Sequence, residues 1–298
     1  MKPNKYQLDF AKKLLKYAGK LAEEGEKELL AMLKSMADNQ NSLLVEVGRI
    51  LLDYDILNEY MSLTPGQIKM EFDKLGELIN YTFTDETIKE IENTKSFLKY
   101  VGNGTWDNSS YLLSLGIDFT LKKIKSKDLE KIINETIKGK IYSDRIKGNK
   151  EKIAKILRKD IKDFLEGKIS VNDIRKKIKD LYNNNAKATK ILVRNEIGRV
   201  QAGVNELWAD EHNIEWQLFD ATLDGKTTET CQRYDGQVFR KDDSNKPIPN
   251  VTTHICCRSC LIALPSKDYR PKTKIDNETK ERIPYTNYKE WKKSKDEE

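Results

Sequence analysis

The chain has little cysteine or histidine, the side chains that supply soft metal ligands and thiol nucleophiles, and all of them lie late in the sequence. Of 298 residues, four are cysteine and two are histidine, and residues 1–211 contain neither. The cysteines all fall between Cys231 and Cys260. A disulfide framework is usually spread through a small secreted domain, so one tight cluster indicates metal binding or redox chemistry instead.

Long apolar runs are also missing. No stretch approaches the roughly 20 apolar residues that span a bilayer, so we expect no membrane segment. The N-terminus leads into a charged amphipathic stretch and lacks the apolar core of a signal peptide. We therefore expect a protein made and kept in a cytoplasm, or in a particle assembled there.

Charge is abundant but nearly balanced. Charged residues make up 34% of the chain and apolar residues 38%, which is typical of long surface helices with narrow apolar stripes. With 54 basic and 48 acidic residues, the net charge is +6. This excess permits contact with DNA or with an acidic protein surface, but solvated lysine-rich helices have the same composition and are the favoured interpretation. The candidate DNA-contacting residues are Lys150, Lys155, Arg158, Lys159, Arg175 and Lys176.

The spacing of apolar residues predicts an α-helical N-terminal region of long helices, residues 1–139. The first helix should run from residue 5 to about 60, with a polar interruption near 38–42. Further helices are expected over 66–80 and 85–100, followed by a turn at 102–104 and a new helix capped by residues 107–110.

A second region, residues 140–267, divides into a helical part, 140–211, and a small α+β module, 212–267. Gly167 should end one helix and Ser170, with Asp173, should cap the next. A break is expected at 183–185. Alternation of apolar residues predicts strands near 214–218 and 237–240, a third at 261–264, and a loop over 241–253. Residues 268–298 are expected to be an extended charged tail with a short helix at 288–293.

Several enzyme signatures are absent. Neither histidine is followed by the Glu of a zinc deaminase, and the sequence has no His-Glu-x-x-His or Gly-Lys-Ser/Thr loop. We expect a non-enzyme. The alternatives are a zinc-dependent hydrolase or nucleic-acid-processing enzyme and a non-specific DNA-binding protein. A metal-free pair of Cys231 as nucleophile and His254 as base is a separate enzyme hypothesis.

The cysteine cluster has the composition of a structural zinc site. Zinc takes about four N or S ligands, which Cys231, His254, Cys257 and Cys260 would supply, with Cys256 as the alternative ligand. Reduced cysteines that pack a turn, or a disulfide, would have the same sequence. Four protein ligands would leave no open position on the metal, which argues against catalysis.

Four sequence features in a fixed order resemble the Mu F-like head-morphogenesis domain of tailed phages. They are Ile141–Ile146 before Glu166–Ser170; Arg194-Asn195-Glu196 opening a helix with Asn205; Trp216 followed by Asp224–Cys231 and Asp235-Gly236; and His254-Ile-Cys-Cys-Arg258. Two departures stand out. The family's Arg-Thr-Glu is Arg194-Asn195-Glu196 here, and its Cys-Arg-Cys becomes Cys257-Arg-Ser-Cys260.

The resemblance implies a minor head protein in the virion, inside the head at the portal vertex. Its partners would be the portal protein and a scaffold or major capsid protein, with roles in procapsid assembly and in DNA packaging or ejection. It also implies structural roles for the motif residues Arg194, Glu196, Asp224, Thr228, Gly236 and Arg258. From their spacing, Arg194 and Glu196 should each pair with another element, and Asp224 and Thr228 should form a capping turn before Cys231.

Overall fold

The computed structural model describes the backbone of residues 5–114 and 122–297 and the side chains of residues 27–110 and 122–297. By their internal contacts the residues form two compact units. The first, here the helical unit, comprises Glu24–Phe97 and Thr136–Val193. The second, here the C-terminal unit, comprises Met1–Glu23, Leu98–Glu135 and Arg194–Glu298. Both units are thus assembled from segments that are far apart in the sequence.

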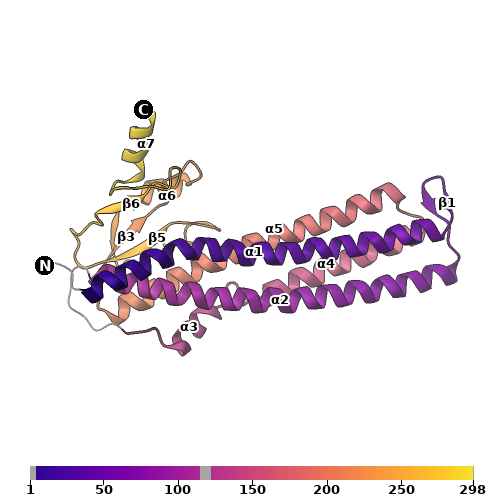
Figure 1. Ribbon diagram of the computed structural model, residues 1–298, viewed down its shortest axis with the longest axis horizontal. Coiled ribbons are helices and arrows are strands. Elements are labelled where there is room, and N and C mark those ends of the chain that lie inside the picture. The colour runs from indigo at the N-terminus through magenta and orange to yellow at the C-terminus, as the bar shows by residue number, and fades with distance from the viewer. Residues whose placement is uncertain (1–4, 115–121, 298) are drawn as a thin grey trace. The chain divides into compact units, whose positions relative to one another are not determined.

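Long helices dominate the chain, and the strands are short and, apart from β1 and β2, lie late in the sequence, which confirms the predicted fold class (Figure 1). The helices are α1 Lys5–Asp53, α2 Pro65–Ser114, α3 Ser126–Ile133, α4 Tyr142–Leu165, α5 Val171–Glu211, α6 Glu229–Tyr234 and α7 Tyr288–Glu297. The strands are β1 Ile56–Leu57, β2 Tyr60–Met61, β3 Trp216–Asp220, β4 Val238–Arg240, β5 Cys260–Leu264, β6 Thr273–Ile275 and β7 Arg282–Pro284.

The helical unit has one core, to which α1, α2, α4 and α5 each contribute an apolar stripe. The stripes repeat every three or four residues, as one face of a helix requires. Each fully buried aliphatic or aromatic side chain contributes about 1.5–3 kcal/mol. The core includes Leu43, Val47, Ile50, Leu75, Ile79, Phe83, Leu157, Ile161, Phe164, Ile174, Ile178 and Tyr182.

The helix breaks predicted near residues 40, 82, 103 and 184 are wrong, and tertiary contacts explain two of them. α2 runs unbroken through 81–84 and 102–110, and α5 runs through 183–185. Gly102 faces α3, where a Cβ would collide with Leu129, so glycine permits close helix packing here rather than a turn. Asn185 is fully buried and its amide donates to the Glu86 carboxylate at 3.3 Å. That hydrogen bond satisfies a residue that prefers turns. α1 likewise continues through 38–42.

The predicted start and stop signals around residue 167 are confirmed. Gly167 has a positive φ, the left-handed conformation that ends α4. Ser170 accepts a hydrogen bond from the Asp173 N–H at 3.1 Å and donates its hydroxyl to the Asp173 carboxylate at 2.9 Å. These contacts cap α5 before the first apolar residue of its stripe.

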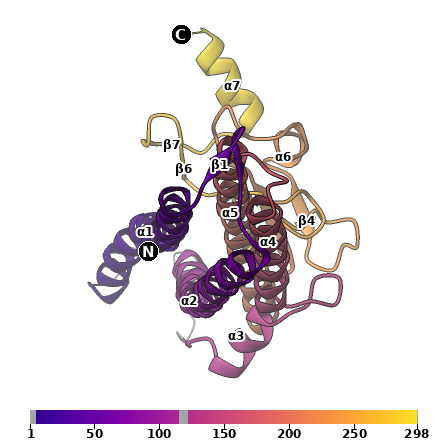
Figure 2. The same ribbon diagram turned by 90° about the vertical axis from the view of Figure 1, so that its right-hand side faces the viewer.

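A hairpin stands where the first helix was predicted to continue. α1 ends at Asp53, and β1 pairs antiparallel with β2, Ile56 opposite Met61 and Leu57 opposite Tyr60. Asn58 and Glu59 both have positive φ, as a two-residue turn between paired strands requires. The hairpin joins α1 to α2 at the end of the helices (Figures 1 and 2).

The C-terminal unit contains a three-stranded antiparallel sheet in the order β4-β3-β5. The predicted strands and the loop over 241–253 are confirmed. Phe219 and Leu261 pack with Cys231 and Cys257 on one side of this sheet. Asn205 of α5 accepts the Ser109 hydroxyl at 2.9 Å and donates to the Leu261 carbonyl at 3.2 Å. This residue of the predicted motif therefore connects α5 to strand β5.

Residues 273–297 do not form the extended tail that the sequence predicts. β6 and β7 pair as a hairpin, and the predicted short helix is part of α7. Tyr288 and Trp291 of α7 are buried against Leu223. Lys274 is also buried, with its ammonium 2.8 Å from Asp235. Some of the charged side chains in this segment are therefore buried in ion pairs, and amino-acid composition does not reveal which ones.

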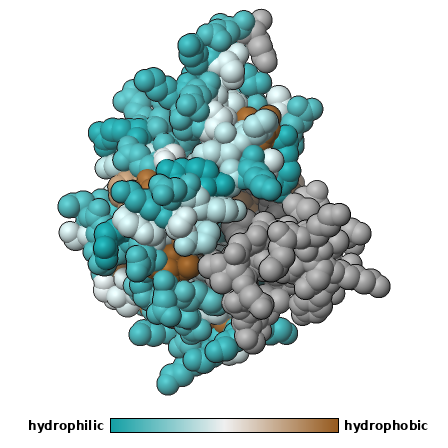
Figure 3. All heavy atoms as spheres, turned by 90° about the vertical axis from the view of Figure 1, so that its left-hand side faces the viewer, coloured by the Kyte–Doolittle hydropathy of each residue, from teal (hydrophilic) through white to brown (hydrophobic). Residues whose placement is uncertain are grey.

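On the face shown in Figure 3, hydrophobic side chains form small separate spots among hydrophilic ones. None of the described helices combines the length and the hydrophobicity that crossing a bilayer requires.

Candidate metal centre

The structure brings Cys231, His254 and Cys257 together, with their ligand atoms within 4.8 Å of one another. The Cys231 sulfur lies 3.2 Å from His254 Nε2 and 3.4 Å from the Cys257 sulfur. Cys231 belongs to α6, whereas His254 and Cys257 belong to the loop between β4 and β5. Both cysteines are buried and carry no disulfide.

A turn before α6 orders the backbone that carries Cys231. Asp224 accepts the Lys226 N–H at 3.0 Å. That contact makes an Asx turn, and the same carboxylate also accepts the Thr227 hydroxyl at 3.2 Å. The Asp224 carboxylate also forms an ion pair with Arg258, whose guanidinium lowers the pKa of Asp224 to about 2. Thr228 is the N-cap residue of α6 by its backbone angles, although its side chain makes no capping hydrogen bond.

The loop that carries the other two candidate ligands is held by asparagine side chains. Asn250 accepts the Cys257 N–H at 2.8 Å and donates to the Cys257 carbonyl at 2.7 Å. Asn195, in place of the family's Thr, accepts the Cys256 N–H at 3.3 Å. A Cβ at Gly198 of α5 would collide with the Asn250 side chain. Asn250 and Gly198 carry no signal in the sequence, because only the folded loop reveals their contacts.

The three side chains fit a zinc ion. For a tetrahedral zinc with usual bond lengths, sulfurs lie about 3.8 Å apart and sulfur and nitrogen about 3.6 Å. The observed separations of 3.4 and 3.2 Å are within a few tenths of an ångström of these values. His254 Nδ1 lies 3.0 Å from the Ile255 carbonyl oxygen, which can only accept, so the proton belongs on Nδ1. Nε2 then presents its lone pair to the sulfurs, the form that binds metal.

The environment of Cys257 also favours the thiolate that a metal needs. The Cys231 thiol, 3.4 Å away, and the hydroxyls of Thr253 and Ser259 can donate hydrogen bonds to its sulfur. These donors lower the pKa of Cys257 to about 5, whereas the pKa of Cys231 is raised. A zinc ion binds cysteine as the thiolate, so metal binding here would release thiol protons.

The expected four-ligand set is corrected by the position of Cys260. Cys260 begins β5 opposite Asp220, and neither it nor Cys256 joins the cluster among the described residues. Side chains alternate along a strand, so with Leu261 facing Cys231 and Cys257, Cys260 faces the other side of the sheet. There, burial raises the pKa of its thiol. The cluster therefore offers three protein ligands, which leaves one position on a tetrahedral metal.

Three further motif residues lie outside the cysteine–histidine cluster. Glu196 is fully buried and pairs with Arg199 at 2.9 Å. Arg199 in turn donates to the carbonyls of Ile132 and Ile133 at 2.7 and 2.8 Å, which holds the end of α3. Arg194 is exposed on α5. Gly236 has a positive φ and closes the turn between α6 and β4, as its sequence predicts.

The candidate DNA-contacting residues do not share one environment. Lys150 is buried, 2.9 Å from both Glu86 and Glu90, so it is corrected to a residue of the helical unit's interior. Lys155, Lys159, Arg175 and Lys176 are exposed, and Arg158 is half-buried. DNA contact by these five residues stays a prediction.

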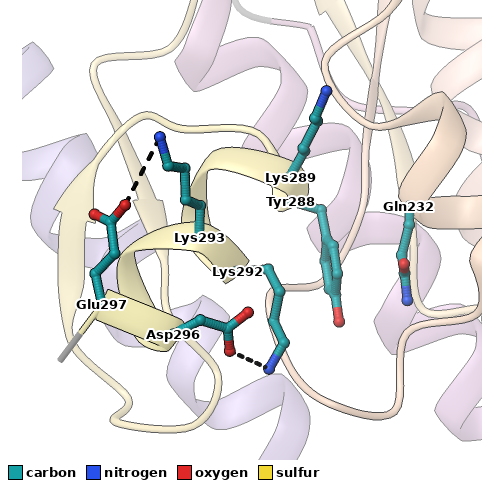
Figure 4. A pocket seen from close by; sticks show the side chains of 7 residues that line it. All are labelled: Gln232, Tyr288, Lys289, Lys292, Lys293, Asp296 and Glu297. Carbon is teal, nitrogen blue, oxygen red and sulfur yellow. Dashed lines mark ion pairs between the residues drawn. The ribbon is translucent and has the colours of Figure 1, made fainter.

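A cavity of about 490 Å³ lies beside α7, and none of the residues that line it is a cysteine or a histidine. Gln232 of α6 and residues of α7 line it (Figure 4). Its Lys292 and Lys293 reach Asp296 and Glu297 at 3.1 and 3.7 Å, so these charges are paired along the helix.

Comparison with known families agrees with the motif order in the sequence. The family model described as Phage Mu protein F like protein matches residues 154–262, from within α4 into β5. The match confirms the resemblance over these residues, which are less than half of the chain. The matched segment contains all three clustered residues. Neither a curated protein nor a solved structure matches the chain.

Proposed function

We propose that this chain, whose residues 154–262 match the phage Mu protein F like family, is a minor head protein that joins the procapsid at the portal vertex. The family match is the observation that carries the proposal. The protein would act by binding: helical surfaces engage portal, scaffold or shell, and the C-terminal unit serves as a compact docking module. Fold-level analogy supports head assembly without choosing among assembly, packaging and ejection.

Structural zinc is the second part of the proposal. Cys231, His254 and Cys257 would hold the ion, which would join α6 to the loop before β5 and replace core that so small a module lacks. The hydrogen bonds from Asn250 and the Asp224–Arg258 ion pair support this role, because they fix both ligand-bearing segments before any ion binds.

The test is co-purification of the full chain with the portal protein of the same phage, with zinc measured in the same sample. We expect a stable complex and one zinc per chain. Cys231→Ala should lose zinc and lower both the thermal stability of the C-terminal unit and portal association. Cys256→Ala, a cysteine outside the cluster, is the matched control and should retain both.

A zinc hydrolase is the second candidate function. The cluster has three protein ligands, and a catalytic zinc ion likewise has three protein ligands and one open position. The same variants separate the two functions. A hydrolase predicts that His254→Ala leaves folding and portal association intact and removes turnover of a substrate. The structural role predicts loss of zinc together with folding stability.

A further inference from the structure

The hairpin tip, residues 52–60, exposes an unusual amount of apolar surface. Leu52 is 88% exposed, Leu57 63%, Tyr60 43% and Ile56 40%. Single exposed apolar residues are normal on a protein surface, whereas several on one short segment mark an interaction site. No motif in the sequence drew attention to this segment, because it was predicted to be helix.

The tip is held rigidly although its strands are only two residues long. Met61 is buried in the core of the helical unit. Tyr54 donates its hydroxyl to Glu71 at 2.8 Å, and Arg49 binds the same carboxylate. The Val171 N–H donates to the Glu59 carbonyl at 3.0 Å, which ties the turn to the start of α5. Two-residue strands would not hold this shape alone, so the helical unit supports the exposed side chains.

A rigid apolar tip is suited to insertion into a pocket. Its conformation is set before binding, so little ordering entropy would be lost on association. The partner's chemistry follows from charge. Residues 50–68 contain no lysine or arginine, and Asp55 and Glu59 are exposed within the tip, whereas Asp53 pairs with Arg49 at 2.6 Å.

We propose that the hairpin tip inserts into an apolar pocket rimmed by lysine or arginine side chains on a partner protein. The acidic residues oppose an anionic bilayer, for which interfacial segments use basic residues. They also oppose tip-to-tip pairing of two copies, which would bring like charges together. This inference rests on the proposed function for the identity of the partner, which is the portal protein.

The experiment measures binding of the full-length chain to the purified portal protein of the same phage. The tip variant is Leu57→Ser/Tyr60→Ser. Tyr81→Ser/Ile88→Ser is the matched control, because these α2 side chains are also exposed, at 76% and 52%. Burying two apolar side chains predicts binding about 10–100-fold weaker for the tip variant and unchanged for the control. Asp55→Asn/Glu59→Gln should weaken binding several-fold at low salt and reduce its salt dependence.

The outcomes distinguish the two proposals. If the wild-type chain does not bind portal, the proposed function fails and the tip proposal fails with it. If tip and control variants bind like the wild type, the tip proposal alone fails. It also fails if the tip residues instead mediate binding to phosphatidylcholine/phosphatidylglycerol vesicles, or self-association in sedimentation equilibrium. If Leu57→Ser/Tyr60→Ser does not fold, Asp55→Asn/Glu59→Gln still tests the proposal, because unchanged binding and salt dependence in that variant would contradict it.

Discussion

Replacing Lys150 by methionine tests whether this lysine is an interior residue or a DNA-contacting one. Its ammonium is 2.9 Å from Glu86 and from Glu90, and all three side chains are at most 4% exposed. Methionine keeps most of the volume and removes the charge. Two buried carboxylates would then face each other without a cation.

Removing one partner of a buried ion pair costs about 3–5 kcal/mol, because a charge is left buried and uncompensated. A domain of this size has about 5–15 kcal/mol of stability in all. With a urea m-value of about 2 kcal/mol/M, the unfolding midpoint of the helical unit should fall by about 1.5–2.5 M. The exposed Lys155, on the same helix, is the matched control, and Lys155→Met should change the free energy of unfolding by less than about 0.5 kcal/mol.

The assay can separate the two units because all four tryptophans, Trp106, Trp208, Trp216 and Trp291, lie in the C-terminal unit. Tryptophan fluorescence should therefore change little, while hydrogen exchange in α4 should accelerate strongly. Adding Glu86→Gln and Glu90→Gln should recover part of the loss, because the carboxylate charges are then gone. Equal midpoints for Lys150→Met and Lys155→Met would refute the reasoning.

Three further predictions concern the C-terminal unit. Gly198→Ala should lower the free energy of unfolding of the C-terminal unit by about 1–3 kcal/mol, because the new Cβ would collide with the Asn250 side chain. Gly148→Ala is the control: its Cβ would meet open space, so this change should raise the free energy of unfolding of the helical unit by up to about 1 kcal/mol. Urea unfolding measures both changes. Lys274→Met should strip Asp235 of its ammonium partner and lower the thermal midpoint read by tryptophan fluorescence, and an unchanged midpoint would contradict the assigned burial. The pKa of Asp224 is lowered from 3.8 to about 2, so its stabilisation is complete above pH 4 and is lost as the pH falls toward 2. Asp224→Asn should remove about 1 kcal/mol at neutral pH and flatten that acid-dependent loss, measured as the thermal midpoint from pH 5 to 2.

Much of the candidate site could be predicted from the sequence, because its residues are rare and close together. Cys231, His254 and Cys257 stand in a chain with two histidines and four cysteines, and the motif order around them led to the family that matches. The fourth ligand could not be predicted this way. Spacing alone put Cys260 in the same turn as Cys257, but β5 begins at Cys260 and directs it to the other face of the sheet.

The sequence by itself determined the helices, their caps at Gly167 and Ser170, the strands of the module and the cluster of candidate ligands, because local spacing and backbone preference set these features. Tertiary structure alone decided where the helices do not break, which lysines are buried, and that residues 273–297 fold onto the module. Each of those outcomes depends on a partner distant in the sequence: Glu86 for Lys150 and Asn185, and Asp235 for Lys274. A polar or charged residue has the same local preference with or without such a partner, so only the folded chain shows whether it is buried.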